Sequence, residues 1–386
     1  MKNKKRAFMI AGIISLTLIP VVFWKQETEA TQVEAQLATI YDIEGKKVSN
    51  LSAVLDFSGC KISNYELFME QLALFPNLNR VELYDSNLTN VQMEGLMQRY
   101  PDVKFVWTIN LGNYWKVKTD QVAFTTNKGP GPNLRNADVE QLKYCTDMVA
   151  LDIGHNWVSD ISFVEYMPKL RILILVDNWV SDLSPIAKCK DLVYLETFVN
   201  PITDVSALTN LVNLIDINIS YNRFTDITPI LNKPRVERLF VTHCGLTREQ
   251  LNQLEAEYPN AQIEYTVTQS IDAGWRTVDR YKAMRQMFKT NTVSELFMTD
   301  VDRLAYYQDV FDAAYYAERH PEIVQQIGDN SMDLLYYFLD TGIAQGHQAC
   351  ESFSIIDYQL ERTDLYPIYG SNLDKYFMNY IGTSER

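Results

Sequence analysis

An asparagine recurs every 22 residues through the middle of this chain of 386 residues. Apolar residues recur with the same period before and after that asparagine, with Thr197 as the one polar exception. One segment of this kind cannot bury its apolar face alone, so the fixed period predicts a stack of short strands joined by return segments. We therefore expect an α/β solenoid with a parallel sheet on its concave face. The column holds Asn156, Asn178, Asn200, Asn222 and then Cys244.

Two polar columns of the repeat are interpreted as scaffold. An asparagine side chain can bond main-chain groups in the bend after each strand, and a buried thiol can replace it beside apolar neighbours. An aspartate column follows, and spaced carboxylates could suggest a cation site. The interpretation we favour is that each aspartate caps the short convex turn that follows it. The aspartates are Asp160, Asp182, Asp204 and Asp226.

A shorter array precedes the 22-residue repeats, with matching columns that recur 26 residues apart around Leu55 and Val81. Residues 88–109 align without gaps to residues 246–267, and each segment is predicted to form a final helix, a Tyr-Pro stop and a closing strand. The Gly- and Pro-rich segment 126–133 is the expected boundary. We therefore expect a short capped array over residues 48–125 and a 22-residue array with its cap over residues 134–268.

The period stops after residue 268, and residues 277–386 are predicted to be mostly helical. Matching residues 42 positions apart indicate two modules of about 40 residues, over 311–347 and 353–386. Each is too small for a large core of its own, so the two should pack on each other. The matched pairs include Phe311 and Phe353, Tyr316 and Tyr358, and Gly328 and Gly370.

The N-terminus is typical of a targeting segment, with a basic start followed by an uncharged apolar stretch over residues 7–24. Residues 1–30 are predicted to be a removed signal peptide or an uncleaved signal-anchor, and both place the bulk of the chain outside the cell. The formal net charge is −14, which disfavours nucleic acid and anionic lipid as partners. Membrane contact is expected only through the N-terminal segment, if it stays uncleaved.

The sequence contains no recognisable motif of a catalytic or metal-binding site. The five cysteines are too sparse for a disulfide framework, and the four histidines show no metal-ligand spacing. No Walker-type loop, His-Glu-x-x-His or Gly-x-Ser-x-Gly motif occurs. We therefore expect no catalytic residues, no metal and no cofactor.

Side chains that alternate with the core positions of the strands are expected to line the concave face. Six of them would form an exposed apolar patch, and such patches usually have a use. Two tryptophans follow the asparagine column on the rim with a tyrosine nearby, and aromatic anchors suit a peptide, a protein surface or a sugar ring. The alternative is that the C-terminal modules or the first array fold back over the patch. The candidate binding residues are Trp157, Trp179, Ile172, Ile174, Val176, Tyr194, Phe198, Tyr221 and Phe240.

The repeats over residues 50–267 resemble internalin-like leucine-rich repeat proteins. The segments VKFVWTI (103–109), LDIGHN (151–156) and AGWRTVDRYKAMRQMF (273–288) are similar to exported leucine-rich repeat proteins of gut Firmicutes. The pattern F-D-x-x-Y-Y-x-x-x-x-P near residue 311 resembles a module of secreted proteins from the same bacteria, with Glu322 and His347 as departures. The resemblance implies a secreted or surface binding protein and supplies no catalytic residues.

Two functions are compatible with these features. The first is extracellular recognition of a protein or glycan through the concave face of the second array. The second is a structural component of the cell envelope, attached through the C-terminal modules with the solenoid as a spacer. Both place the chain outside a Gram-positive bacterium, secreted or tethered to the outer face of its cytoplasmic membrane.

Overall fold

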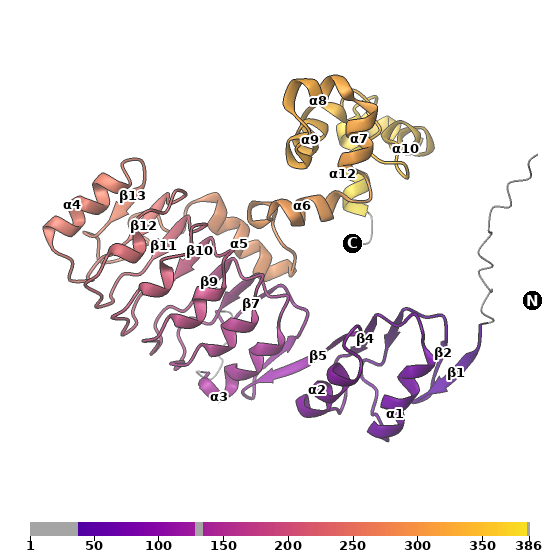
Figure 1. The fold of residues 1–386 in the computed structure, drawn as a ribbon, viewed down its shortest axis with the longest axis horizontal. Helices are drawn as coiled ribbons and strands as arrows, with labels where there is room; N and C mark the ends of the chain where they lie inside the picture. Colours follow the sequence, from indigo (N-terminus) through magenta and orange to yellow (C-terminus); the bar gives the residue numbers. More distant parts are fainter. Residues whose placement is uncertain (1–37, 128–133, 384–386) are drawn as a thin grey trace, which may run out of the picture.

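The computed structural model describes residues 38–127 and 134–383. The predicted signal peptide or anchor over residues 1–30 lies outside this described part, as do residues 128–133 of the expected boundary. In the described part, no helix has the length and apolar character needed to cross a lipid bilayer. Figure 1 shows a short run of strands, then a longer regular stack of strands, and finally a body of helices.

The first stack begins with an antiparallel hairpin and continues as a four-stranded sheet in the order β3-β4-β5-β6. Strands β3, β4 and β5 are parallel, whereas β6 returns antiparallel to β5. The 26-residue spacing leaves room for an α-helix of seven residues in the return segment. The elements are β1 (Ile40–Ile43), β2 (Lys46–Ser49), β3 (Val54–Asp56), α1 (Tyr65–Gln71), η1 (Leu72–Leu74), β4 (Arg80–Leu83), α2 (Asn90–Arg99), β5 (Lys104–Leu111) and β6 (Trp115–Lys118).

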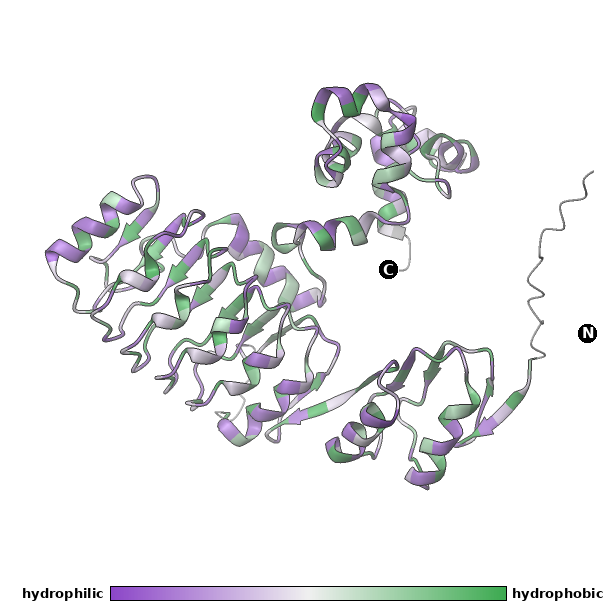
Figure 2. Cartoon of the chain, in the orientation of Figure 1, coloured by the Kyte–Doolittle hydropathy of each residue, from purple (hydrophilic) through white to green (hydrophobic). Residues whose placement is uncertain are grey.

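The second stack is a seven-stranded sheet in which every strand is parallel to its neighbour. Its register pairs Leu173 with Leu151 and Leu195, so the predicted core column is confirmed. The strands are β7 (Ala123–Thr125), β8 (Ala150–Asp152), β9 (Ile172–Ile174), β10 (Tyr194–Glu196), β11 (Asp216–Asn218), β12 (Arg238–Phe240) and β13 (Gln262–Glu264). In Figure 2 these strands are largely green, as expected for a sheet buried on both faces.

The return segments of the second stack are short because a 22-residue period leaves few residues beyond the strand and its bends. Most of them form single 3-10 turns of three to five residues. The stack ends in a longer helix with a Thr247–Gln250 capping box, matching the Thr89–Gln92 box of α2. The elements are α3 (Asn136–Val139), η2 (Glu140–Tyr144), η3 (Ser162–Tyr166), η4 (Ser184–Lys188), η5 (Ser206–Leu208), η6 (Thr228–Ile230) and α4 (Arg248–Glu257).

The second sheet begins earlier than its sequence pattern indicates. Strand β7 was expected to belong to the first array, but it pairs with β8 and forms the edge of the second sheet. The spacing from Phe124 to its partner Leu151 is 27 residues, so this strand does not follow the 22-residue period that marks the others. The change of sheet therefore falls between β6 and β7, before residues 126–133.

The two stacks share one continuous hydrophobic core, which runs from Ile43 to Tyr258. At their junction Trp107 of β5 packs against Tyr144 with ring centroids 5.1 Å apart. Asp147 accepts hydrogen bonds from Lys104 of the first stack and Lys169 of the second. The predicted cap of the first array therefore does not end its core, because α2 and β5 pack directly onto the next repeats.

The C-terminal helices form a second core. Phe338 and Phe377 pack 5.9 Å apart, so residues of both predicted modules meet in one cluster. Gly328 and Gly370 both follow a helix with positive φ, a conformation that favours glycine. The elements are α5 (Asp279–Thr290), η7 (Glu295–Phe297), α6 (Asp300–Tyr307), α7 (Ala313–Arg319), α8 (Pro321–Ile327), α9 (Ser331–Tyr337), the π-helical turn η8 (Phe338–Gly342), α10 (Ile355–Glu361), α11 (Tyr366–Tyr369) and α12 (Leu373–Thr383).

Candidate functional site

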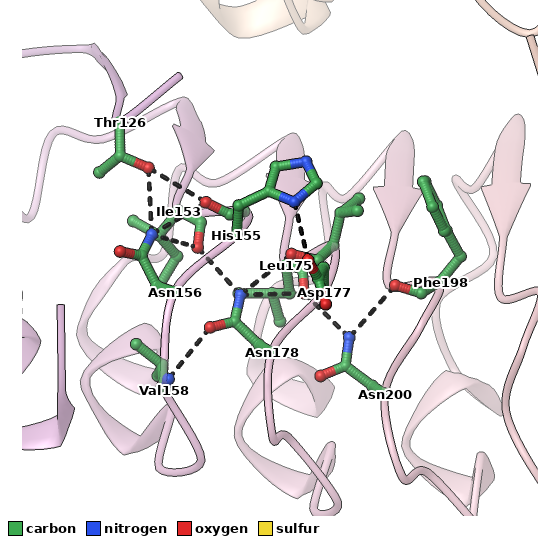
Figure 3. A network of polar contacts seen from close by, with 12 residues as sticks. Thr126, Ile153, His155, Asn156, Val158, Leu175, Asp177, Asn178, Phe198 and Asn200 are labelled. Atoms are coloured by element: carbon green, nitrogen blue, oxygen red, sulfur yellow. Dashed lines mark hydrogen bonds and ion pairs between the residues drawn. The ribbon is translucent and has the colours of Figure 1, made fainter. Parts of the chain in front are cut away.

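The asparagine column forms a hydrogen-bonded ladder inside the solenoid (Figure 3). Asn178 accepts from the Val158 main-chain N–H at 3.0 Å and donates to the Ile153 carbonyl oxygen at 2.9 Å. Each asparagine thereby links its own repeat to the preceding one. Cys244 continues the pattern, since its thiol donates to the Ile219 carbonyl oxygen. The scaffold interpretation of this column is confirmed.

The aspartate column is exposed, and each carboxylate accepts a hydrogen bond from the main-chain N–H two residues later. Asp182 accepts from Ser184 at 2.7 Å, and the other three repeat this contact. Hydrogen bonds from the side chain and main chain of Thr228 lower the pKa of Asp226 below its ordinary value. The residues described here contain no group of three or more His, Cys, Asp or Glu side chains able to hold a metal ion.

The concave side chains of β8 to β12, together with Val176 and Thr242, are called the floor. The prediction that the floor exposes an apolar patch is wrong. Ile172, Tyr194 and Phe240 have no exposed surface, and Ile174 and Val176 are also buried. Phe198 is half-buried and packs at the edge of the same cluster. These residues are covered by their own chain, but by a segment that belongs neither to the first array nor to the two C-terminal modules, which were the covers that the sequence suggested.

The cover is formed by residues 268–302, called the strap. It contributes Trp275, Met284, Met287 and Phe297 to the cluster that buries the floor. Helix α5 of the strap lies against the β7–β9 end of the sheet in Figure 1. The Asn291 side chain, just after α5, accepts from the main-chain N–H groups of Val122 and Ala123. The strap therefore runs back from the end of the solenoid toward the start of its second sheet.

Trp275 is the central apolar contact between the strap and the floor. It is fully buried, and its ring centroid lies 4.8 Å from that of Phe240 and 5.5 Å from that of Tyr194. The Arg238 guanidinium lies 4.2 Å from the indole centroid, at cation–π distance. This aromatic residue fills the floor much as a ligand side chain would.

Charged groups join the strap to the floor around this contact. Asp216 is completely buried and accepts from Arg238 Nε at 2.6 Å and Arg280 Nε at 2.8 Å. Arg280 also reaches Glu237 at 2.5 Å. Arg171 donates to the Phe297 carbonyl oxygen at 2.8 Å and pairs with Asp302. Buried charges are tolerated where they are paired in this way.

Two further floor carboxylates lie beside a small cavity of about 20 Å³ that strap residues also line. Burial raises the pKa of Glu196 to about 7, although a hydrogen bond from the Tyr194 hydroxyl opposes the shift. Burial also raises the pKa of Asp152, which accepts from the Thr125 hydroxyl at 2.8 Å. A cavity of this size holds at most one water molecule. This cavity is therefore too small for an organic ligand.

The predicted rim tryptophans are exposed. Trp157 retains 50% of its surface and Trp179 retains 66%. The Arg135 guanidinium lies 4.8 Å from a ring centroid of Trp157. Tyr221 differs from the prediction, because its hydroxyl donates to the Thr268 carbonyl oxygen and its ring packs on His243. The repeat places a row of exposed residues along this edge, called the rim strip: Arg135, Trp157, Trp179, Pro201 and Arg223.

Sequence reasoning did not identify the strap residues as partners of the floor. Trp275 and Arg280 fall in a segment outside the repeats, whose resemblance to other leucine-rich repeat proteins indicates no contact with the concave face. One signal was available: residues 275–290 carry five basic side chains and one acidic one, in a chain whose net charge is −14. A cationic segment beside an acidic solenoid favours intramolecular docking.

Parallel strands, a 22-residue period and an asparagine ladder define this chain as a leucine-rich repeat solenoid. No protein-family model and no curated protein matches it. Among solved structures, an internalin from Listeria monocytogenes is 17% identical with a TM-score of 0.29, over 59% of this chain and 87% of that one. Internalin C2 from the same species is 19% identical with a TM-score of 0.28, over 53% and 85%. A leucine-rich repeat protein from Leptospira interrogans is 16% identical with a TM-score of 0.32, over 51% of each chain.

Proposed function

We propose that this chain is a secreted or surface-tethered recognition protein that binds a partner protein through the rim strip. The observation that carries the proposal is the exposure of Trp157 and Trp179 in neighbouring repeats, while the apolar floor beside them is filled. Tryptophan and arginine are the residues most enriched among binding hot spots, and the strip has arginine at both ends. The basic, apolar N-terminal segment supports the proposed location outside the cell.

A glycan is the competing ligand for the same strip. Sugar rings stack on open indole faces, whereas the Arg135 guanidinium already lies over a ring of Trp157. Trp179 is more exposed than Trp157, at 66% against 50%, so it supplies the more open face. Because Arg135 partly covers the ring of Trp157, a protein surface that contacts both the guanidinium and the ring is favoured as the ligand.

The test compares the wild-type chain with a Trp157→Ala/Trp179→Ala double variant and a Tyr166→Ala control. Tyr166 is a matched control because it is 57% exposed in η3, away from the rim strip. Labelled chains are applied to an immobilised surface-protein fraction and to immobilised cell-wall polysaccharide. We expect the double variant to lose at least about tenfold in affinity for the protein fraction, with the control unchanged.

Protease treatment of the immobilised fraction should then abolish wild-type binding. Equal binding by the double variant would reject the rim strip as the site. Binding that survives proteolysis but is lost after periodate oxidation of the polysaccharide would assign the strip to a glycan instead.

A second candidate function is attachment to the cell envelope through the C-terminal helices. The observation that favours it is a set of exposed apolar side chains, Leu360, Ile368 and Met378, each about two-thirds exposed. Ile368 and Met378 line an open groove of about 670 Å³. Substituting these three residues by serine should release the chain from isolated cell envelopes; unchanged retention would remove this candidate.

A further inference from the structure

The interface between strap and floor is less well satisfied than the rest of the described protein. Nine buried side-chain polar atoms in residues 38–127 and 134–383 have no hydrogen bond of normal geometry, and six of them belong to the floor, to the strap or to Arg171, which precedes β9 and binds the strap. Native interiors keep such groups few, because each costs the desolvation of a polar atom. The six atoms are Arg171 Nε, Glu196 Oε1, Asn218 Nδ2, Arg238 Nη2, Thr242 Oγ1 and Trp275 Nε1.

The contrast with the solenoid core is informative. The asparagine ladder satisfies its polar atoms repeat after repeat, and within the described solenoid core only Thr197 and Ser58 add to the unpartnered atoms. The described scaffold therefore leaves few buried polar atoms without a partner, whereas the segment placed on its concave face is less completely bonded. A contact of that kind opens more readily than the scaffold beneath it.

The groups by which the strap binds the floor would be the same if the strap came from a second copy of the chain. Arg238 and Arg171 donate to the main-chain carbonyl oxygens of Trp275 and Phe297. Asp216 takes Arg280, and the floor accepts the Trp275 ring. The cationic segment 275–290 complements an acidic chain wherever that segment comes from.

The connector into the strap consists of tight turns that can straighten. Main-chain hydrogen bonds close successive turns from Gln269 to Asp272, from Ile271 to Gly274 and from Ser270 to Trp275. Ile271 is 53% exposed, and Gly274 has a φ of 78°. Hinge loops of short turns invite exchange of the element that they connect.

We propose that the strap exchanges between two copies of this chain, so that Trp275 and Arg280 of one copy fill the floor of the other. The exchange is symmetric and closed, because each copy donates one strap and receives one. The contacts in the exchanged dimer are those already made within one chain, and only the connector changes conformation. The rim strip plays no part in the exchange.

The first test uses two complementary full-length variants. A strap variant carries Trp275→Ala and Arg280→Ala, and a floor variant carries Asp216→Ala. Neither closes its own floor fully, so trypsin should cleave each strap at least about tenfold faster than the wild-type strap. Mixing the two allows the intact strap of the floor variant to dock on the intact floor of the strap variant.

We expect the mixture to show the mass of a dimer by light scattering, and the strap of the floor variant to regain protection from trypsin. A floor variant that also carries the two strap substitutions is the control, and it should gain neither mass nor protection. A mixture that remains monomeric, with unchanged cleavage and a folded solenoid by circular dichroism, would overturn the proposal.

A second measurement keeps the proposal testable if the variants fail to fold. Wild-type chains labelled separately with a donor and an acceptor fluorophore are mixed, loosened in moderate urea and returned to buffer. We expect energy transfer together with dimer mass, and excess synthetic peptide of residues 270–298 should suppress both. Monomeric chains without energy transfer would show that the strap serves only its own chain. Neither test involves Trp157 or Trp179, so its outcome is independent of ligand binding at the rim strip.

Discussion

Arg238 holds Trp275 in two ways: its Nη1 donates to the main-chain oxygen of that residue at 2.7 Å, and its guanidinium lies 4.2 Å from the indole centroid. One side chain of β12 thus fixes both the backbone and the ring of a residue 37 positions later. The same guanidinium is oriented by Asp216 of the neighbouring strand. This arrangement explains why the apolar floor is filled, while Trp157 and Trp179 on the edge of the repeats stay exposed.

Trp275→Ala should destabilise the strap without unfolding the solenoid. The residue is fully buried, and truncation of a buried tryptophan costs about 3–5 kcal/mol. Hydrogen exchange should show faster exchange for amides of α5 and unchanged protection for β8 to β11. Trp179→Ala, at an exposed tryptophan, is the control and should change stability by less than about 0.5 kcal/mol. Loss of protection across the whole sheet would mean that strap and solenoid unfold together.

Glu196 should make the stability depend on pH. Burial raises its pKa from an ordinary value of 4.5 to about 7, so the folded chain binds this proton more tightly than the unfolded chain. Its stabilising contribution is complete below pH 4.5 and is lost as the pH rises through about 7. A shift of this size corresponds to about 3 kcal/mol.

Glu196→Gln removes this titration and retains the shape of the side chain. As the pH rises from about 5 to about 8, the free energy of unfolding of the wild type should fall relative to that of the variant. Urea unfolding of both proteins at the two pH values measures this change. Parallel pH profiles for the two proteins would show that Glu196 does not titrate in this range.

The asparagine ladder predicts that two substitutions at Asn178 differ in how much stability they cost. Alanine leaves the Val158 N–H and the Ile153 carbonyl oxygen without this partner, so the loss should reach about 2–4 kcal/mol. Cysteine should cost less, because Cys244 holds the equivalent position and donates to a carbonyl oxygen there. Urea unfolding of both variants measures the order, with exposed Asp177→Ala as the control. Equal losses for alanine and cysteine would contradict the role assigned to the thiol.

Asp147 should stabilise the junction of the two sheets. Burial raises its pKa, but hydrogen bonds from Lys104 and Lys169 outweigh this effect and lower the pKa below 3.8. The contribution is therefore present above that value and is lost as the pH falls through the lowered pKa. Since both lysines are half-exposed, Asp147→Asn should cost only about 1 kcal/mol near neutral pH. Thermal unfolding near neutral pH and in acid checks this, and a loss of the same size in acid would contradict it.

Several features of the fold could be predicted from single residues and their spacing. The asparagine period located strands β8 to β12, and the alternation within each strand identified which side chains face the concave side. The exposed tryptophans followed from their place after the asparagine. Strand β7 was missed, because its 27-residue spacing to β8 breaks the period that identified the other strands.

The occupant of the floor could not be predicted in this way. Ile172 and Tyr194 were correctly assigned to the concave face, but exposure depends on what else packs there. Tyr221 likewise lies on the rim, yet its hydroxyl is engaged by the strap connector at Thr268. These contacts join residues with no shared pattern, and no local rule relates them.

The sequence by itself determined the repeat, its register and the scaffold role of its polar columns, because those depend on interactions between neighbouring repeats at a constant spacing. The tertiary structure alone decided that the concave face is closed and that the rim strip remains open. Arg171 meets the Phe297 carbonyl oxygen across 126 residues of sequence. A contact over that separation depends on how a non-repeating segment folds back and on its charge and shape matching the floor, neither of which a repeat period records.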